Sequence, residues 1–597
     1  VPARKRIQDR LTQLWDYEKF GIPFEKGGRY FYSYNSGLQN QNVFYSTPWL
    51  GGEAQVLIDP NTLSADGTVA LAGLAPSEDG QRVAYAISDA GSDWMTWKVR
   101  DVASGADLDD VIRWSKFSGA EWLPDGQGFF YGRFPEPGEG DDLRAANFFQ
   151  KVYLHKLGTS QEEDLLIWED PEHKDWRADA TVTDDGAYLI LTLGRGTDDK
   201  YRILYRPLAD SDAEPIHLVG DFDADYTFID NDGPRLFFRT DKDTPLGKVI
   251  AINVHHPEPE HWETIIPEAP ETLLGASRIG DKLFAQYLKD ARSQVKIFDL
   301  AGTFEREVEF PEIGTASGFS GDRDDTETFY AFSSFTRPTT IYRYDLASGS
   351  STIYKEPQVG FNPDDYITEQ VFYTSKDGTR VPMFLSHKKG IEISPETPTL
   401  LYGYGGFNIS LTPSFSVSRL VWMELGGVYA VPNLRGGGEY GEPWHKAGTK
   451  LQKQNVFDDF IAAAEYLIAE GRTSTPKLAI QGRSNGGLLV GACMTQRPDL
   501  FGACLPGVGV LDMLRFHTFT IGWAWTDDYG SSENPDEFQA LYAYSPYHRI
   551  EPGTCYPPTL IVTADHDDRV YPAHSFKFAA AMQAAQGCDN PILIRIE

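Results

Sequence analysis

Hydrophobic residues follow two different patterns along the chain, and the change falls near residue 358. In the first part, short runs of aromatic and β-branched residues recur about every 40 to 60 residues, each after a turn that contains glycine. Asp-Gly turns provide the left-handed backbone that tight hairpins need, and repeats of this length are typical of a β-propeller. We therefore predict a seven-bladed β-propeller over residues 18–358, with a pair of β-sandwiches as the alternative. The runs are YFYSY, VAYAI, FFYGRF, YLILTL, LFFRT, LFAQY and TFYAFS, and their turns carry Gly28, Gly80, Gly126, Gly186, Gly233, Gly280 and Gly321.

From residue 359 onward, strands alternate with helices. Buried-type runs such as LAIQG, TLIVTAD and PILIRIE are separated by longer helical stretches such as FDDFIAAAEYLIAEG. Strands that alternate with helices usually pair in parallel, so we predict a doubly wound, mostly parallel α/β domain over residues 359–597. Residues 1–17 form an amphipathic helical pattern, and we expect this segment to pack on the second domain because a propeller does not need it.

Composition narrows the class of protein. The chain has 597 residues and a formal net charge of −33, which argues against nucleic acid as a partner. No apolar run is long enough for a membrane span, and the first residues do not form a signal peptide. We expect a cytoplasmic monomer. A periplasmic or secreted protein is the alternative, because the sequence starts inside a helical pattern and its N-terminus is expected to be truncated.

The four cysteines are Cys493, Cys504, Cys555 and Cys588, all in the C-terminal part of the chain. Their spacing matches neither a zinc site nor a disulfide framework. We therefore expect free, mostly buried thiols in a reducing compartment.

The stretch LAIQGRSNGGLLVGA, residues 478–492, contains the clearest chemical motif. It places Gly482, Ser484 and Gly486 as G-x-S-x-G between a strand and a helix, which is the setting of a hydrolase nucleophile. The glycines remove Cβ atoms where the chain bends sharply. We predict that Ser484 is a nucleophile and that the backbone N–H of Asn485 faces a developing oxyanion. The alternative is a glycine-rich turn with an incidental serine.

A serine nucleophile also needs a base and an acid that orients it. The strand TLIVTAD is followed by Asp565, Asp567 and Asp568, each of which is a candidate acid by position; a solvated acidic loop is the alternative. His566 lies within this loop and His574 begins a predicted helix, so neither leaves room for a separate loop that carries the base. The residues alone therefore indicate a nucleophile and an acid without a convincing base.

Longer motifs resemble the prolyl oligopeptidase family over nearly the whole chain. The resemblance implies a seven-bladed propeller that caps an α/β-hydrolase domain, and a serine endopeptidase without cofactor or metal that cuts short peptides after proline. The motifs are GLQNQNVFY, LIDPNTLSADGTVAL and GSDWMTW in the first part, and LYGYGGFNISLTPSFS, NLRGGGEYGEPWHKAG, KQNVFDDFIAAAEYLI, GRSNGGLL, RPDLFG, AWTDDYG and TADHDDRV in the second.

The resemblance implies a role for individual residues of the catalytic centre. Ser484 matches the family's nucleophile and Asp567 its acid. The Tyr404 hydroxyl and the Asn485 amide match its oxyanion donors. The family's base follows the strand that PILIRIE matches, so the catalytic histidine is expected beyond Glu597.

The resemblance also implies a substrate pocket. Trp525 matches the ring that stacks on the substrate proline, Phe407, Tyr529 and Val570 match other walls, and Arg569 matches a donor to a substrate carbonyl. Proline is a rigid apolar ring without an N–H, and a flat indole offers it a large contact area without a hydrogen bond.

Other functions remain open at this point. The same fold could serve a peptidase with basic specificity, an esterase or a peptide macrocyclase, although Trp525 and Phe407 favour proline. A binding protein with an inactive hydrolase domain is a further alternative, supported only by the missing base. His445 is expected to be structural, and the histidines of HHPEPEH, residues 255–261, are expected to lie in a solvated surface loop rather than a metal site.

Overall fold

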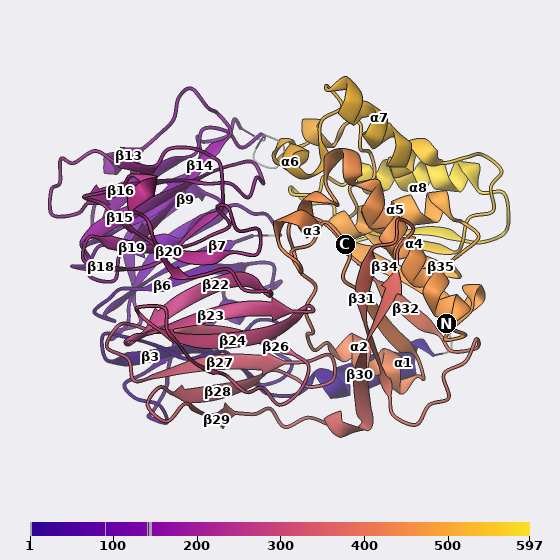
Figure 1. Cartoon of the computed structure of the whole chain (residues 1–597), viewed down its shortest axis with the longest axis horizontal. Helices are drawn as coiled ribbons and strands as arrows, with labels where there is room; N and C mark the ends of the chain where they lie inside the picture. Colours follow the sequence, from indigo (N-terminus) through magenta and orange to yellow (C-terminus); the bar gives the residue numbers. More distant parts are fainter. Residues whose placement is uncertain (1–2, 90, 140, 142–145) are drawn as a thin grey trace.

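The computed structural model describes residues 3–89, 91–139, 141 and 146–597. Two domains lie side by side, with the β-rich one formed by the first part of the chain and the mixed α/β one by the second (Figure 1). A disc of radiating sheets faces one end of a twisted sheet that is flanked by helices.

The first domain consists of seven separate antiparallel sheets. Because the strands of each sheet follow one another in sequence and do not extend into the next sheet, the arrangement is a seven-bladed propeller, and the β-sandwich alternative is wrong. The blades are β1–β5 (residues 19–58), β6–β9 (70–115), β10–β13 (120–168), β14–β17 (176–219), β18–β21 (226–266), β22–β25 (272–307) and β26–β29 (315–355).

The seven aromatic runs used for the prediction all lie in an inner strand of a blade. β11 (Gly128–Arg133) and β27 (Glu327–Ser333) are examples, with five buried residues each. Their side chains are covered on both faces by neighbouring blades, which explains why the runs read as continuous apolar stretches. The turns before them need glycine: Gly80 has φ 64°, and a Cβ there would lie 2.4 Å from the Lys26 carbonyl oxygen.

The second domain is built on one eight-stranded sheet, and the predicted mostly parallel sheet is confirmed. The first two strands, β30 and β31, are antiparallel additions at one edge, and the remaining strands pair in parallel. The strand order is β30 (Tyr366–Thr374), β31 (Arg380–Lys388), β33 (Val428–Pro432), β32 (Thr399–Tyr402), β34 (Leu478–Arg483), β35 (Ala503–Gly507), β36 (Thr559–Thr563) and β37 (Ile592–Ile596).

Helices pack against this sheet and complete its core. α4 (Gln454–Ala469) and α5 (Asn485–Gln496) contribute apolar side chains that are fully excluded from water, Phe457, Phe460 and Leu488 among them. The other helices are α2 (Val417–Glu424), α3 (Glu442–Lys446), α6 (Thr526–Tyr529), α7 (Pro535–Tyr544) and α8 (Ala573–Ala585).

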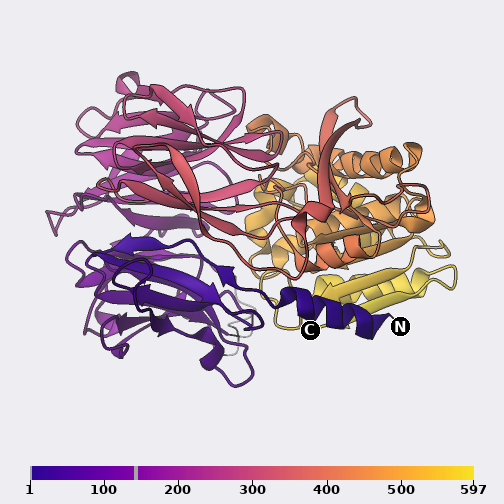
Figure 2. The ribbon, with the colours of Figure 1, turned by 90° about the horizontal axis from the view of Figure 1, so that it is seen from below.

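The N-terminal helix α1 (Arg4–Trp15) lies beneath the second domain, although the propeller follows it in sequence (Figure 2). Leu14 is buried in a cluster with Val417 and Leu420 of α2. The Arg10 guanidinium donates to Glu424 at 2.5 and 2.8 Å. These contacts connect the N-terminal helix to the second domain, which is formed by the C-terminal part of the chain.

One expectation about the cysteines is wrong. Cys555 and Cys588 form a disulfide with a Cα–Cα distance of 5.1 Å, whereas Cys493 and Cys504 are free and buried. The two paired residues are 33 positions apart, but α8 runs back along the sheet and brings the segment after it beside the segment that leads into β36. A sequence spacing cannot reveal such a return.

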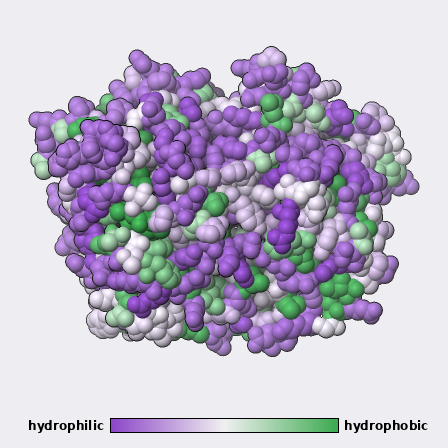
Figure 3. Space-filling view, in the orientation of Figure 1, coloured by the Kyte–Doolittle hydropathy of each residue, from purple (hydrophilic) through white to green (hydrophobic). Residues whose placement is uncertain are grey.

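The surface of the molecule is mostly hydrophilic, as expected for a chain with many charged residues. Hydrophilic residues cover most of the face in Figure 3, and the apolar residues on it are scattered rather than gathered in one large patch. Within the described ranges, no helix combines the length and the apolar character that a membrane span requires.

Candidate active site

Ser484 lies at a sharp turn between β34 and α5. Its backbone has φ 57° and ψ −120°, which a residue with a side chain adopts only under strain. The Ser484 N–H donates to the Gly507 carbonyl on the neighbouring strand at 2.9 Å, and its carbonyl accepts from Leu488 at 3.1 Å. The strand before it and the helix after it thus hold the turn from both sides, as the G-x-S-x-G prediction requires.

The motif's glycines are explained by close backbone contacts. A Cβ on Gly482 would lie 2.3 Å from the Gly486 carbonyl oxygen, and a Cβ on Gly486 would lie 2.6 Å from the Gly403 carbonyl oxygen. Any side chain at these positions would therefore push β34, α5 and the loop after β32 apart. Close packing around the turn therefore requires glycine at both of these positions of the motif.

Two further residues face the serine hydroxyl or stand next to it. The Tyr404 hydroxyl lies beside the Ser484 side chain, and burial, with Asp528 nearby, raises the pKa of Tyr404 to about 12. This phenol is therefore a neutral donor at physiological pH. Asn485 is the first residue of α5, where backbone N–H groups have no partner within the helix. Its side chain donates to the Tyr404 carbonyl at 2.6 Å and so holds the tyrosine loop against the helix.

The three aspartates after β36 have three different environments. Asp565 is exposed and contacts His566 at 2.6 Å. Asp568 is buried and forms an ion pair with Lys116 of the propeller at 2.8 Å. Asp567 accepts hydrogen bonds at Oδ1 from two backbone N–H groups of its own loop, at 2.8 and 3.1 Å. Burial raises the pKa of Asp567, and those two hydrogen bonds act in the opposite direction.

The two histidines near this loop are engaged elsewhere. His566 contacts its neighbour Asp565. His574 is buried on α8, where its Nδ1 accepts from the Asp512 N–H at 3.1 Å. Burial lowers the pKa of His574 to about 4, so the ring is neutral. Neither observation favours His566 or His574 as the base.

Four apolar side chains border the site. Phe407 meets Tyr529 edge to face, with ring centroids 5.3 Å apart. Tyr529 and Val570 are buried, while Trp525 is partly exposed at the end of a short 3₁₀ helix and packs near Phe516. Phe407, Trp525 and Tyr529 thus form an aromatic wall, and the Tyr529 hydroxyl joins it to the serine turn by donating to Asn485 Oδ1 at 3.0 Å.

Arg569 is held by the propeller. Its guanidinium donates to both oxygens of Asp93, at 2.9 and 2.5 Å. Asp93 lies between β7 (Arg82–Ser88) and β8 (Met95–Asp101), and its own N–H donates to Asp568 at 3.3 Å. The second blade therefore braces the acid loop at Asp568 and Arg569, the two residues that follow Asp567.

A buried carboxylate below the aromatic wall was missed from the sequence. Asp528 accepts from the Phe407 N–H at 3.0 Å, from the Lys453 ammonium at 3.1 Å and from His445 at 3.1 Å. Burial opposes ionisation of this carboxyl, but Lys453 and His445 outweigh it and lower the pKa of Asp528. Asp528 and Lys453 both stood in the motifs AWTDDYG and KQNVFDDF, yet no spacing rule connects residues that are 75 positions apart.

Comparison with known proteins accounts for both domains. The model of the prolyl oligopeptidase N-terminal β-propeller domain matches residues 1–357, and that of the prolyl oligopeptidase family matches residues 413–597. A prolyl endopeptidase of Elizabethkingia meningoseptica is 47% identical over 598 residues, which cover 100% of this chain and 84% of the relative.

Solved structures agree with this. A chain from a structural and mechanistic study of two prolyl endopeptidases gives a TM-score of 0.96 at 40% identity, covering 100% of this chain and 88% of the other. Prolyl oligopeptidase B from Galerina marginata, bound to a 35mer hydrolysis and macrocyclisation substrate, gives 0.95 at 34% identity, with 100% and 87% covered. The apo form of that protein gives a TM-score of 0.76.

A strained serine turn, an acid loop after β36 and a set of aromatic side chains thus occur in one chain. Its propeller matches one model of this family over residues 1–357, and its catalytic domain matches the other over residues 413–597. The chain belongs to the prolyl oligopeptidase family and is a serine endopeptidase specific for proline.

Proposed function

We propose that this chain hydrolyses short peptides on the carboxyl side of proline, with Ser484 as the nucleophile and Asp567 as the acid. The observation that carries the assignment is the Ser484 turn, whose strained backbone presents the hydroxyl beside Tyr404 and the N-terminus of α5. Strain of this kind persists where the surrounding structure imposes it, and it collects at active sites.

In the proposed reaction, Ser484 Oγ attacks the carbonyl carbon of the prolyl residue and gives its proton to a base. The carbonyl oxygen becomes an oxyanion, which accepts hydrogen bonds from the Asn485 N–H and the Tyr404 hydroxyl. Collapse expels the amine with the proton from the base and leaves an ester on Ser484. Water, deprotonated by the same base, then releases the acid and restores the serine.

We propose that the base is a histidine in the segment that follows Glu597. The Glu597 carbonyl accepts from the Asp565 N–H at 3.1 Å, so the end of β37 lies beside the acid loop. Both backbone hydrogen bonds to Asp567 end on Oδ1, and Oδ2 is the oxygen that can accept from an imidazole. An imidazolium there would also offset the raised pKa of Asp567.

Proline specificity is proposed to come from Trp525, Phe407, Tyr529 and Val570. An aromatic surface suits a ring that has no N–H to satisfy. Arg569 would donate to a substrate carbonyl, which requires it to share its guanidinium with Asp93. Within the propeller, loops of several blades contact the catalytic edge, and this cover would restrict the site to short, flexible peptides.

The partner and compartment proposals follow from the same chain. The named groups come from one polypeptide, which is consistent with a monomer. The expected cytoplasmic location depended on free thiols, and the Cys555–Cys588 disulfide favours an oxidising compartment instead. We therefore propose a periplasmic or secreted enzyme.

The nucleophile is tested by covalent capture in the full-length protein. A blocked Gly-Pro phosphonate ester should form an adduct on the peptide that contains Ser484, as read by mass spectrometry. The Ser484→Ala variant should give no adduct, whereas Ser348→Ala, which removes an exposed propeller serine, should be labelled like the wild type. An adduct on another residue in the wild type would refute the assignment.

A macrocyclase shares these steps up to the ester and differs in the group that attacks it. The similarity to a structure that holds a hydrolysis and macrocyclisation substrate makes this the second candidate. Incubation with a long linear peptide distinguishes the two functions, since one yields linear products and the other a cyclic product.

A further inference from the structure

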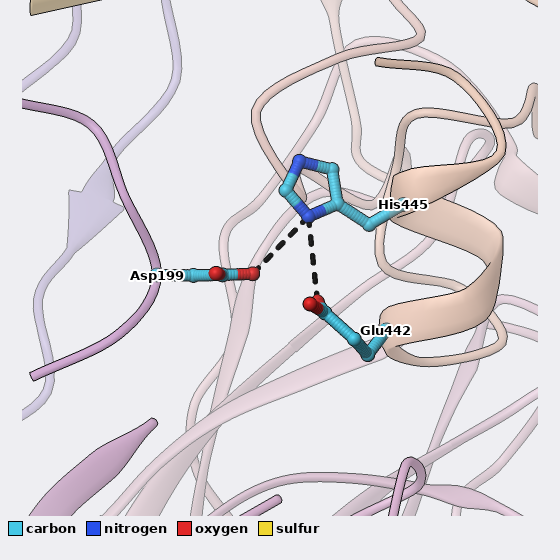
Figure 4. Close-up of side chains that lie close together, drawn as sticks. All are labelled: Asp199, Glu442 and His445. Atoms are coloured by element: carbon cyan, nitrogen blue, oxygen red, sulfur yellow. Dashed lines mark hydrogen bonds and ion pairs between the residues drawn. The ribbon is translucent and has the colours of Figure 1, made fainter. Parts of the chain in front are cut away.

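A cluster of charged side chains joins the two domains below the aromatic wall. Asp199 belongs to the propeller, between β15 (Tyr188–Arg195) and β16 (Arg202–Pro207), while Glu442 and His445 lie on α3 of the catalytic domain (Figure 4). His445 Nδ1 lies 3.2 Å from Asp199 Oδ2 and 3.6 Å from Glu442 Oε2. On the other side of the ring, Nε2 lies 3.1 Å from Asp528 Oδ1.

His445 is charged in this setting. It is only 5% exposed, and burial alone would lower its pKa. Hydrogen bonds to Asp199 and Asp528, together with the nearby Glu442 carboxylate, outweigh burial and raise the pKa of His445 to about 10. Both ring nitrogens therefore act as donors at neutral pH, and one imidazolium connects a propeller carboxylate with a catalytic-domain carboxylate.

The geometry is that of an ion-pair network rather than a metal site. The oxygens of Asp199 and Glu442 already face ammonium groups: Lys446 lies 3.5 Å from each, and Lys200 lies 3.3 Å from Glu442. A protonated Nδ1 has no lone pair to offer a metal ion. The cations that balance these carboxylates are thus supplied by the chain itself.

The carboxylate on the inner side of His445 supports the aromatic wall. Asp528 Oδ1 accepts both from His445 and from the Phe407 N–H. Phe407 has φ 56°, so its backbone depends on such an anchor. The Lys453 ammonium, on Asp528 Oδ2, also lies 5.1 Å from the Tyr529 ring centroid. Asp528 therefore connects His445 to two walls of the pocket.

The same propeller loop reaches the opposite wall. The Thr197 N–H and hydroxyl both donate to the Ala524 carbonyl, at 2.9 and 2.7 Å. Ala524 immediately precedes Trp525. A Cβ on Gly196 would lie 2.9 Å from that carbonyl oxygen, so the loop is in direct contact with the segment that carries the indole. Residues 196–199 thus brace both sides of the pocket.

We propose that His445 is a positioning residue that couples the seating of the propeller on the catalytic domain to the shape of the proline pocket. With Asp199 in place, the imidazolium holds Asp528 and, through it, the Phe407 backbone. When the propeller moves away, His445 loses its outer carboxylate and the Phe407 wall loosens. This inference rests on the proposed function, since it takes Phe407 and Trp525 as walls of the pocket.

The kinetic test compares Gly-Pro and Gly-Ala fluorogenic substrates on the full-length enzyme. Glutamine at position 445 is neutral and carries both N–H donors on one nitrogen, so it cannot span two carboxylates on opposite sides of the ring. His445→Gln should therefore lower the ratio of kcat/KM for Pro over Ala by about tenfold, as expected for one lost charged hydrogen bond. Asp199→Asn, which alters only the propeller side, should lower it by about threefold. The double variant should be no worse than His445→Gln, because both changes interrupt one connection.

Lys446→Met is the matched control. Lys446 is the next residue on α3 and pairs with Asp199 and Glu442, but Asp528 is not among its ion-pair partners. If the cluster only held the domains together, this variant would change the ratio as much as His445→Gln does. We expect the ratio to stay at its wild-type value.

The pH dependence of the Pro-to-Ala ratio gives a further readout, because titration of the catalytic groups affects both substrates alike. The wild-type ratio should hold through neutral pH and fall as pH rises toward 10, where His445 loses its proton. In Asp199→Asn the fall should begin at lower pH. The charged groups around His445 are Asp199, Lys200 and Arg239 on the propeller and Glu442, Lys446, Lys453 and Asp528 on the catalytic domain.

Hydrogen exchange decides the inference independently of activity. The backbone amides of the peptide that contains Phe407 should exchange about tenfold faster in His445→Gln than in the wild type. Their exchange should also be faster in Asp199→Asn, but it should keep the wild-type rate in Lys446→Met. Unchanged exchange in the first two variants, or an unchanged substrate ratio in both, overturns the inference. A wild-type enzyme without any preference for proline would instead contradict the proposed function, and the exchange result would still stand.

Discussion

At the scale of single residues, backbone geometry explains what a short motif can and cannot reveal. Gly482 and Gly486 could be interpreted from the sequence because the contacts that exclude a Cβ come from the motif itself and the loop after β32. The Asp567 assignment depended on a family resemblance. Asp565, Asp567 and Asp568 are equivalent by position in the sequence, and only their environments in the structure distinguish them. The first is exposed, the second accepts backbone hydrogen bonds from its own loop, and the third forms a buried ion pair.

The cysteines illustrate the opposite case. Nothing in the spacing of Cys555 and Cys588 indicates pairing, since proximity arises from the return of α8 along the sheet. With one disulfide and two buried free cysteines, thiol titration of the unfolded, unreduced chain should find two thiols, and four after reduction. Four thiols before reduction would contradict both the disulfide and the proposed oxidising compartment.

At the scale of secondary-structure elements, the periodic patterns predicted the fold correctly because every repeat has the same structural requirements. Every blade needs an inner apolar strand and a tight turn before it, so the aromatic runs and glycines marked all seven blades. The α/β sheet was predictable for a similar reason. The contacts between elements of different domains could not be predicted. Lys116 and Asp568, for example, are 452 positions apart, and no sequence pattern near either residue indicates that they meet.

That ion pair gives the prediction for the domain interface. Lys116 and Asp568 are 2% and 3% exposed, and removing one partner of a buried pair leaves a charge without compensation, at a cost of about 3–5 kcal/mol. Lys116→Met should therefore lower the free energy of unfolding by about that amount, measured by denaturant unfolding monitored at more than one wavelength.

Two further variants make this result specific. Lys116→Met combined with Asp568→Asn removes both charges and should recover most of the loss. Lys151→Met breaks a pair with Glu169 whose side chains are 34% and 39% exposed, and should cost no more than about 1 kcal/mol. If Lys116→Met were no less stable than Lys151→Met, the pair would not hold the interface.

At the scale of the whole molecule, loops of the propeller contact the candidate active site of the second domain. The second blade braces the acid loop through Asp93 and Lys116, and the fourth contacts both walls of the pocket through residues 196–199. The fifth and sixth blades also reach the catalytic domain: the Pro245 carbonyl accepts from the Glu442 N–H, and Asp290 accepts from the Tyr440 hydroxyl. A moving propeller would therefore change the site, which the sequence could not show.

The central claim is that a Ser484 nucleophile and an aromatic pocket together make a proline-specific peptidase. It is tested most directly by the turnover of blocked Gly-Pro, Gly-Ala and Gly-Arg substrates with one fluorophore, by the full-length enzyme and by Ser484→Ala. The account predicts turnover that strongly favours Gly-Pro and is abolished in the variant. Equal or faster cleavage of Gly-Arg or Gly-Ala, or activity that survives Ser484→Ala, would contradict it.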